Sequence, residues 1–404
     1  MRSSVGLFVV ALLMLASLAF AQAAHGADDR TLYTGDEFFA IVRHSPMPPV
    51  PPDPTDRVAG DPRAAKFGQY LFFDRRFSSN GQISCATCHV PSRAFTDGRS
   101  VAEALGTGTR HTPTLLGAAY NQWYFWDGRT DSQWSQALHP FENPLEMGTT
   151  RRHVVDVVLN DPSTRRAYEQ IFGAPPKLTT AHGIDRVYSN LGKAIEAYER
   201  KLIVGTSPFD RYVAALRAGD AKGESVISPA AKRGLKLFAG RANCELCHSG
   251  ADFTDGQFHN IGLPLDHGEI ADRGRADGIR QVLADRFDGT GPFSDARHGT
   301  ARDRLAFLPQ AATQVGAFKT PSLRNIARIA PYMHDGRFTN LSQVLDFYAR
   351  GADAGHGQLV GKREETLSLI PHLSAAQKSD LIAFLRTLDD APLPAELTHA
   401  PATP

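Results

Sequence analysis

The pentapeptide C-x-x-C-H occurs twice in this chain, at residues 85–89 and at residues 244–248. It is the attachment signature of c-type haem, in which two thiols bind the porphyrin vinyl groups and the adjacent His is held under the iron. A zinc site would want four ligands, and a redox C-x-x-C pair would not need His in the next position twice. The sequence therefore predicts two covalent haems, held by Cys85, Cys88 and His89 and by Cys244, Cys247 and His248.

The N-terminus predicts export. Arg2 precedes an apolar run from Val5 to Phe20, and small residues follow it, which is the pattern of a secretory signal peptide spanning residues 1–23. A retained N-terminal anchor is the alternative, although the run is short for a membrane span. Since c-type haem is attached outside the cytoplasmic membrane in bacteria, we expect a periplasmic protein with no membrane span after signal cleavage. The net charge of +1 gives no indication of nucleic-acid binding.

Helical patterns dominate the chain, and no alternating β pattern of any length is present. Helices are expected to begin at Asp61-Pro62 and Ser228-Pro229, because each pair supplies a side-chain cap followed by proline at the first helical position. A long helix is expected over residues 184–202. Ser374 and Gln377 form a capping box, which predicts a last helix ending near residue 388.

Three segments lack such patterns. The proline-rich stretch 44–61 is typical of an extended, mobile lead-in. Residues 268–304 are rich in Gly, Asp and Arg and predict a long surface excursion. The end of the chain, residues 393–404, is expected to be a disordered tail.

The two halves of the sequence repeat one another. G-x-x-L-F precedes each haem motif and F-T-D-G follows it. Thr112 of a T-P-T-L segment precedes Asp127 of a D-G-R segment by the same spacing that separates Thr320 from Asp335 in the second half. We therefore predict a mainly α protein of two tandem cytochrome c-type domains related by duplication, over residues 24–210 and 211–392.

The duplication also predicts what lies over each haem. After D-G-R, the chain of each half is expected to return across the distal face of its own haem. In the second half this return, residues 341–350, contains Tyr348, which is a good iron ligand. In the first half, residues 132–147 contain Glu142 and Glu146, and a carboxylate is a poor haem ligand but a good proton shuttle.

These motifs together resemble the bacterial dihaem cytochrome c peroxidase family, which includes MauG. The resemblance covers residues 61–388 and rests on both haem motifs, F-W-D-G-R at 125–129, P-L-E-M-G at 144–148 and F-K-T-P-S-L-R-N at 318–325. It implies a peroxidatic N-terminal haem and an electron-transfer C-terminal haem. It also implies roles for Glu146 as distal acid–base residue, for Gln136 as its neighbour and for Trp126 as the relay between the haems.

The chain departs from the ordinary peroxidases of that family at three places. The axial Met of the second haem is replaced by Tyr348, fourteen residues after His334, which is the MauG arrangement; Met333 is a rival ligand. The loop between Gly98 and His111 lacks the His that caps the resting first haem, and Glu103 takes its place. The resemblance also implies a calcium ion between the haems, but the Asn that supplies a side-chain ligand in the family is replaced here by His111. The candidate calcium ligands of this chain are His111 and the backbone carbonyls of Ile329 and Pro331.

Three functions remain open from the sequence. The first is a MauG-like peroxidase that uses hydrogen peroxide to oxidise a protein substrate at a distance. The second is a scavenging cytochrome c peroxidase that takes electrons from a small cytochrome or copper protein. The third is a plain dihaem electron carrier, which the missing His in the loop argues against. Glu146 could instead be a solvated surface residue, and Glu142 takes its role if the register of this segment differs. Trp126 could be a core aromatic without a redox role.

Overall fold

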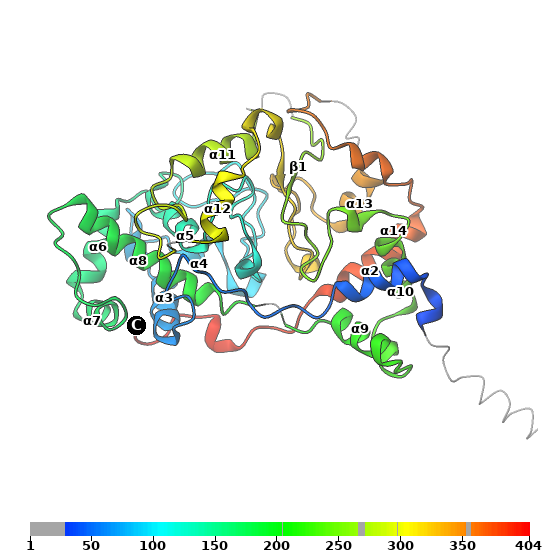
Figure 1. Cartoon of the computed structure of the whole chain (residues 1–404), viewed down its shortest axis with the longest axis horizontal. Coiled ribbons are helices and arrows are strands. Elements are labelled where there is room, and N and C mark those ends of the chain that lie inside the picture. The colour runs from blue at the N-terminus through cyan, green and yellow to red at the C-terminus, as the bar shows by residue number, and fades with distance from the viewer. Residues whose placement is uncertain (1–28, 204, 266–270, 297, 353–356) are drawn as a thin grey trace, which may run out of the picture.

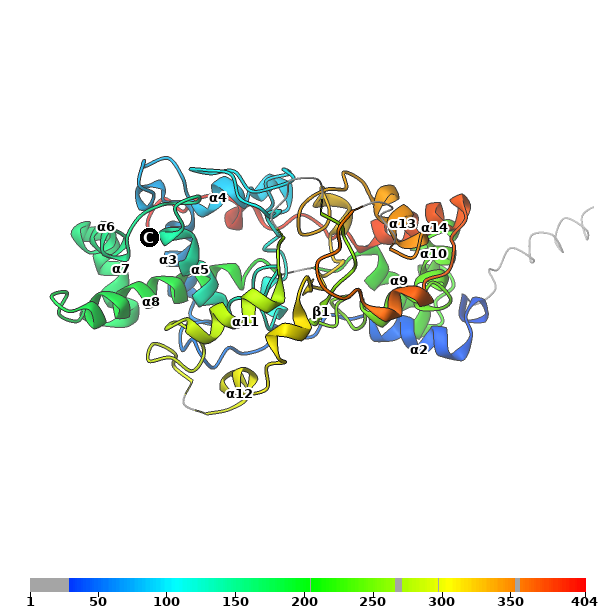
Figure 2. The same cartoon turned by 90° about the horizontal axis from the view of Figure 1, so that it is seen from above.

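The computed structural model describes residues 29–203, 205–265, 271–296, 298–352 and 357–404. The expected signal peptide, residues 1–23, lies outside these residues. The described chain is mainly helical and forms two lobes side by side along the long axis (Figure 1). The view turned by 90° shows the same two lobes, which adjoin at the centre (Figure 2). Within the described part, no helix is both long and apolar enough to cross a membrane.

The helices and strands are as follows. The helices are α2 (Gly35–Arg43), α3 (Pro62–Phe73), α4 (Cys85–Cys88), α5 (Gln133–Glu142), α6 (Arg151–Asn160), α7 (Pro162–Phe172), α8 (Ala181–Glu199), α9 (Pro208–Ala218), α10 (Pro229–Ala239), α11 (Arg275–Ala284), α12 (Thr300–Ala306), α13 (Leu341–Ala349) and α14 (Ala375–Leu385). Strands β1 (Phe258–His259) and β2 (Phe318–Lys319) form one short antiparallel pair.

Each lobe is built on one pair of packed helices. In the first lobe α3 packs against α8, and in the second α10 packs against α14. The predicted caps are confirmed, because Asp61 and Ser228 accept hydrogen bonds from the first turns of α3 and α10, and Ser374 forms its capping box at α14. The long helix α8 lies about three residues earlier than expected because Thr180 caps it.

The repeated glycine of G-x-x-L-F explains how these helices meet. A Cβ atom on Gly68 would lie 1.7 Å from the Ala194 carbonyl oxygen of α8, and one on Gly234 would lie 1.9 Å from the Asp380 carbonyl oxygen of α14. Only glycine therefore lets the two backbones of each pair touch. The same close approach recurs in both lobes, as expected from a duplication.

The D-G-R segments also have the same backbone in both halves. Phe125 and Met333, two residues before the aspartates, adopt positive φ values of 63° and 74°, which are uncommon for residues other than glycine. An isolated bridge joins Tyr124 to Thr130 in one half and Tyr332 to Phe338 in the other. The duplication predicted from sequence thus extends to strained backbone positions.

The two ends of the chain pack on opposite lobes. Tyr33 and Ile41, near the N-terminus, are buried in the core of the second lobe. The last residues pack on the first lobe, where the Tyr198 hydroxyl donates to the Leu397 carbonyl (2.6 Å) and the Gln69 amide donates to the His399 carbonyl (2.8 Å). Residues 393–404 are therefore not the disordered tail that the sequence suggested, and each lobe contains chain from beyond the expected boundaries at 210 and 392.

Two further segments are more closely packed than the sequence indicated. The lead-in 44–61 buries Val58, and its Thr55 hydroxyl accepts a hydrogen bond from the Trp134 indole at 2.9 Å. The excursion 268–304 is not confined to the surface, because Phe287 and Phe293 enter the core of the first lobe. Both aromatic rings lie far along the sequence from the helices that they cover, so no local pattern marked them.

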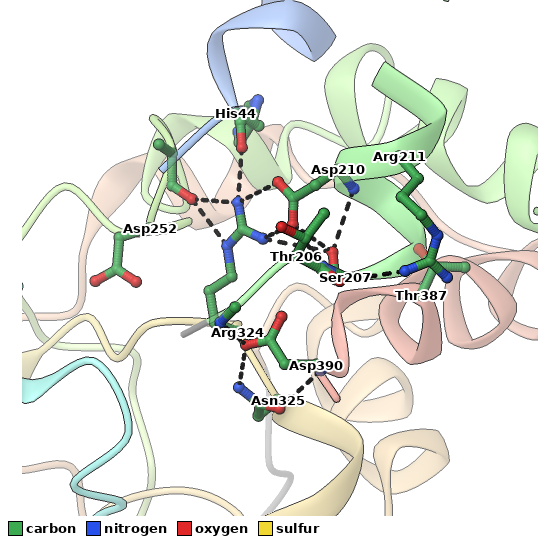
Figure 3. Close-up of polar contacts among 12 residues, drawn as sticks. His44, Thr206, Ser207, Asp210, Arg211, Asp252, Arg324, Asn325, Thr387 and Asp390 are labelled. Atoms are coloured by element: carbon green, nitrogen blue, oxygen red, sulfur yellow. Dashed lines mark hydrogen bonds and ion pairs between the residues drawn. The ribbon is translucent and has the colours of Figure 1, made fainter. Parts of the chain in front are cut away.

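The buried Arg324 joins the lead-in 44–61 and helix α9 to the second lobe. The Arg324 side chain is 1% exposed and pairs with the Asp210 carboxylate at 2.5 and 3.0 Å (Figure 3). It also donates to the carbonyls of His44 (2.9 Å) and Ala251 (3.0 Å). Buried polar groups require such partners, and here one side chain fixes three separate segments around the second haem motif.

Gly234→Ala is expected to destabilise the second lobe. The added methyl group meets the Asp380 carbonyl, and forcing α10 and α14 apart costs roughly 1–3 kcal/mol, which exceeds the gain in helix propensity of about 1 kcal/mol from replacing glycine by alanine. Thermal unfolding followed by circular dichroism measures the effect. Gly60→Ala is the control, because nothing lies within 4 Å of its Cβ position, and equal melting temperatures of the two variants would contradict this account of the packing.

Candidate haem and active site

A cavity of about 670 Å³ lies between the two halves of the protein. Both haem motifs reach it, through Cys88 and His89 from the first and Cys244, Cys247 and His248 from the second. Cys85 packs against the core of the first lobe from α4. The structure thus brings together two motifs that lie 159 residues apart in sequence and gives them one common apolar enclosure, which suits a porphyrin.

Each motif histidine is held by a backbone carbonyl. The Nδ1 atom of His89 donates to the Phe95 carbonyl (3.0 Å), and that of His248 donates to the Phe253 carbonyl (2.9 Å). Both phenylalanines have positive φ values, which turn their carbonyls toward the rings. Burial lowers the pKa of both imidazoles, so each ring is neutral and keeps the Nε2 lone pair for iron.

The cysteines fit haem attachment better than the alternatives. None of the four forms a disulfide, and burial raises the pKa of the Cys88 and Cys244 thiols to about 12, which disfavours the thiolate that a redox C-x-x-C pair requires. Among the described residues, the one group with the spacing of metal ligands is Cys247, Asp255 and His259. It has fewer than the four protein ligands of a structural zinc site.

Glu146 lies in the cavity wall, as predicted, together with Gln136 of α5. Its carboxylate accepts a hydrogen bond of 2.6 Å from the Asn143 side chain. Burial raises the pKa of Glu146, and the nearby Arg129 charge partly opposes this. Glu142, the alternative, pairs with Arg151 at 2.7 Å outside the cavity wall. The geometry therefore favours Glu146 as the carboxylate that meets a substrate.

The loop between Gly98 and His111 presents small side chains to the cavity. Ala102, Ala104 and Gly108 line it. Glu103, which the resemblance aligns with a ligating His, is half exposed and pairs with Arg99. Neither His nor Met from residues 98–110 lines the cavity, so this loop offers no strong iron ligand.

Tyr348 of α13 lines the second part of the cavity with His248. Burial raises the pKa of its phenol well above the ordinary value. A phenolate at this place therefore requires a cation beside it, as ferric iron would be. Met333, the rival ligand, packs with Phe347 and Leu367 in a small apolar cluster, although it also borders the cavity.

Trp126 connects the two halves at the middle of the cavity wall. Its indole Nε1 atom donates to the His111 carbonyl in the first half (2.9 Å), and its own carbonyl accepts from the Lys319 amide in the second half (2.8 Å). The side chain of Trp126 is thus fixed from one side and its backbone from the other. A position of Trp126 between the haems stays a prediction.

The structure adds two charged residues that sequence reasoning missed. Lys319 donates from its ammonium to the Asn121 side chain (3.0 Å) and the Trp123 carbonyl (2.9 Å), and burial lowers its pKa to about 8. His259 lies between the carboxylates of Asp255 (2.8 Å) and Glu364 (3.1 Å), and the bond to Asp255 chiefly raises its pKa to about 11. Lys319 belongs to the F-K-T-P-S-L-R-N motif, so the sequence could have pointed to it. Glu364 lies in no motif, and nothing in the neighbouring sequence indicates that it bonds to His259.

The candidate calcium ligands also lie together. His111, Ile329 and Pro331 all border the cavity. The His111 ring is already engaged, because its Nδ1 atom donates to the Arg99 carbonyl at 2.7 Å. Calcium binding at this place stays a prediction of the resemblance.

Comparison with known proteins identifies the family. Residues 62–218 match the family described as di-haem cytochrome c peroxidase. The chain is 34% identical over 348 residues to the methylamine utilization protein MauG of Methylorubrum extorquens, which covers 84% of this chain and 82% of that protein. It is 32% identical over 379 residues to the cytochrome-c peroxidase IdrP1 of Pseudomonas sp. strain SCT, covering 89% and 92%.

A solved structure agrees with these relatives. The crystal structure of a MauG-like protein associated with microbial copper homeostasis has a TM-score of 0.66 and 27% identity, over 88% of this chain and 98% of that one. Its fold accounts for the two cytochrome c-type lobes. The haem motifs, the shared cavity and the relatives lead to one conclusion: the chain belongs to the di-haem cytochrome c peroxidase and MauG family of haem oxidoreductases.

Proposed function

We propose that this protein reduces hydrogen peroxide at the N-terminal haem and, in the manner of MauG, passes the oxidising equivalents through a Tyr-ligated C-terminal haem to a protein. The observation that carries the proposal is Tyr348, which lines the cavity with His248 at the place where ordinary peroxidases of the family carry Met. The protein that reacts is a small cytochrome, a copper protein or another exported protein.

The residues present fit two covalent haem c groups. Cys85, Cys88, Cys244 and Cys247 each add one S–H across a vinyl group to form a thioether, while His89 and His248 supply the proximal nitrogens. Bound there, the first haem supplies a ferric iron that activates peroxide, and the second supplies a store for oxidising charge. The signal peptide predicted over residues 1–23 and a periplasmic location are consistent with this attachment chemistry.

Glu146 is the proton shuttle of this mechanism. As carboxylate it takes the proton from the inner oxygen of hydrogen peroxide, and as acid it returns this proton to the outer oxygen, which leaves as water. Asn143 holds the carboxylate by its 2.6 Å hydrogen bond, and Gln136 borders the same wall. Because burial raises the pKa of Glu146, the base form is lost on acidification at a higher pH than for an exposed Glu.

Trp126 carries electrons between the two sites, and Tyr348 sets where oxidising charge rests. The indole of Trp126 is held at a fixed orientation by the His111 carbonyl, so little reorganisation accompanies its oxidation. An anionic phenolate is a harder ligand than a thioether and stabilises ferric and higher states. Tyr348 therefore favours storage of oxidising charge at the second haem over delivery of electrons from it.

A scavenging cytochrome c peroxidase is the second candidate, because the relative IdrP1 bears that name. The residues that line the cavity near the first haem motif favour both peroxidase candidates over a plain electron carrier. A carrier needs two strong ligands on each iron, and loop 98–110 contributes to the cavity only Ala102, Ala104, Gly108, Thr109 and Arg110.

The first expected outcome concerns the resting protein. Because loop 98–110 offers no axial ligand, the N-terminal haem is expected to be high-spin in the ferric state, whereas the C-terminal haem is low-spin. Electron paramagnetic resonance of the purified protein checks this. Two low-spin signals without a high-spin one would show that some residue caps the first site.

Glu146→Gln is expected to slow peroxide cleavage by about a hundredfold or more, because the amide cannot accept and return the proton. Stopped-flow absorption after mixing with peroxide measures the rate. Glu142→Gln is the matched control, since that residue pairs with Arg151 away from the cavity. Haem content should be unchanged in both variants, and a wild-type rate in Glu146→Gln would remove this residue from the mechanism.

Tyr348→Met is expected to raise the reduction potential of the C-terminal haem, because a thioether replaces a phenolate. The variant should lose the ability to store a second oxidising equivalent, while the wild type reacts with peroxide without prior reduction. Potentiometric titration and optical spectra measure both effects. Met333→Leu is the control for the rival ligand. If that variant rather than Tyr348→Met changed the potential, or if the wild type first required one-electron reduction, the scavenging peroxidase would be the better assignment.

A further inference from the structure

His111 occupies the position at which the family resemblance implies a calcium ligand. Calcium takes six to eight oxygen ligands, and the implied site combines an Asn side chain with the backbone carbonyls of Ile329 and Pro331. In this chain the Asn oxygen is replaced by an imidazole. An imidazole has no oxygen and offers at most one nitrogen lone pair, so the ligand set loses the side-chain oxygen that a hard cation prefers.

The His111 ring instead makes contacts of its own with backbone carbonyls. The residue is 4% exposed. Since a carbonyl can only accept, the 2.7 Å bond to the Arg99 carbonyl places a proton on Nδ1. Burial lowers the pKa of the ring, and the Ile329 carbonyl, one of the two expected calcium ligands, is among the neighbouring groups that oppose this shift. The side chain is thus bonded to the loop of its own half and has a carbonyl of the second half nearby.

The backbone of His111 joins the halves as well. Its N–H donates to the His334 carbonyl of the second half at 2.7 Å. Its carbonyl accepts from the Trp126 indole at 2.9 Å. The position that would supply one oxygen to calcium therefore already connects the loop after the first haem motif, the relay tryptophan and the second lobe.

Beside His111, arginine side chains pair with the carboxylates where the two halves meet. The Arg110 guanidinium pairs with Asp127 (2.6 Å) in its own half and, through two nitrogens at 2.7 and 2.8 Å, with Asp272 in the other half. Arg129 also pairs with Asp127, at 3.1 Å. Both carboxylates thus have cationic partners, and a divalent cation beside Arg110 would be repelled by it.

We propose that the His111 imidazole replaces the interhaem calcium ion in this protein and that, with Arg110, it joins the two halves without a metal. This inference concerns the junction and goes beyond the proposed reaction, because it holds for either peroxidase candidate. It makes the chain a calcium-independent member of its family.

The wild-type holoprotein provides the first test. One sample is dialysed against EDTA and another against calcium chloride, and each is examined by elemental analysis, thermal unfolding and electron paramagnetic resonance of the ferric haems. The expected result is no stoichiometric calcium and the same melting temperature and spectra in both samples. One calcium ion per chain, or a loss of stability in EDTA, would overturn the proposal even if peroxide turnover were as proposed.

His111→Asn provides the second test, because it restores the implied oxygen ligand. The variant is expected to bind one calcium ion by isothermal titration calorimetry, to unfold at a lower temperature in EDTA and to recover on addition of calcium. His153→Asn is the control, since the ring of that exposed residue of α6 bonds to the Arg76 carbonyl, away from the junction. If His111→Asn remained folded and bound no calcium, His111 would not be what replaces the metal.

Discussion

The hydrogen bond between each haem-motif histidine and a phenylalanine carbonyl fixes the geometry on which the whole site depends. Phe95 and Phe253 hold their carbonyls in place by a left-handed backbone, and this sets the face that each imidazole presents to the cavity. The other side chains that line the cavity are then free to differ between the two halves. The same fold places Glu146 in one half and Tyr348 in the other, so a duplicated scaffold presents a carboxylate to one part of the cavity and a phenol to the other.

The charged groups between the two halves complement this division. A buried carboxylic acid, Glu146, has its pKa raised, whereas a buried ammonium, Lys319, has its pKa lowered to about 8. Both shifts have burial as their main cause, because a low-dielectric cavity disfavours either charged form. Burial thus favours the uncharged form of both groups, and Trp126 is held in position by uncharged carbonyl and amide groups rather than by ion pairs.

Much of this arrangement was predictable from sequence because it is carried by short repeated motifs. The caps at Asp61, Ser228 and Ser374 identified helix starts from local hydrogen bonding alone. The contacts that were not predicted involve residues far apart in the chain and often only a backbone atom of one partner. The bond from Tyr198 to the Leu397 carbonyl is one, and burial of Phe293 in the first lobe is another. Every residue has a backbone carbonyl, so the sequence does not show which one accepts a hydrogen bond. A single Phe in a Gly- and Asp-rich stretch belongs to no periodic apolar pattern, so its burial cannot be predicted from its neighbours.

The packing of each chain end on the opposite lobe has a consequence for how the protein reaches its native state. Residues near Leu397 complete the first lobe, and residues near Ile41 complete the second. Contacts that span so much sequence form late, since the intervening chain must be ordered first. During synthesis, the first lobe cannot close until the last residues emerge. The two lobes thus mature as one unit, and a chain shortened by only a dozen residues at its C-terminus would leave the lobe at its other end incomplete.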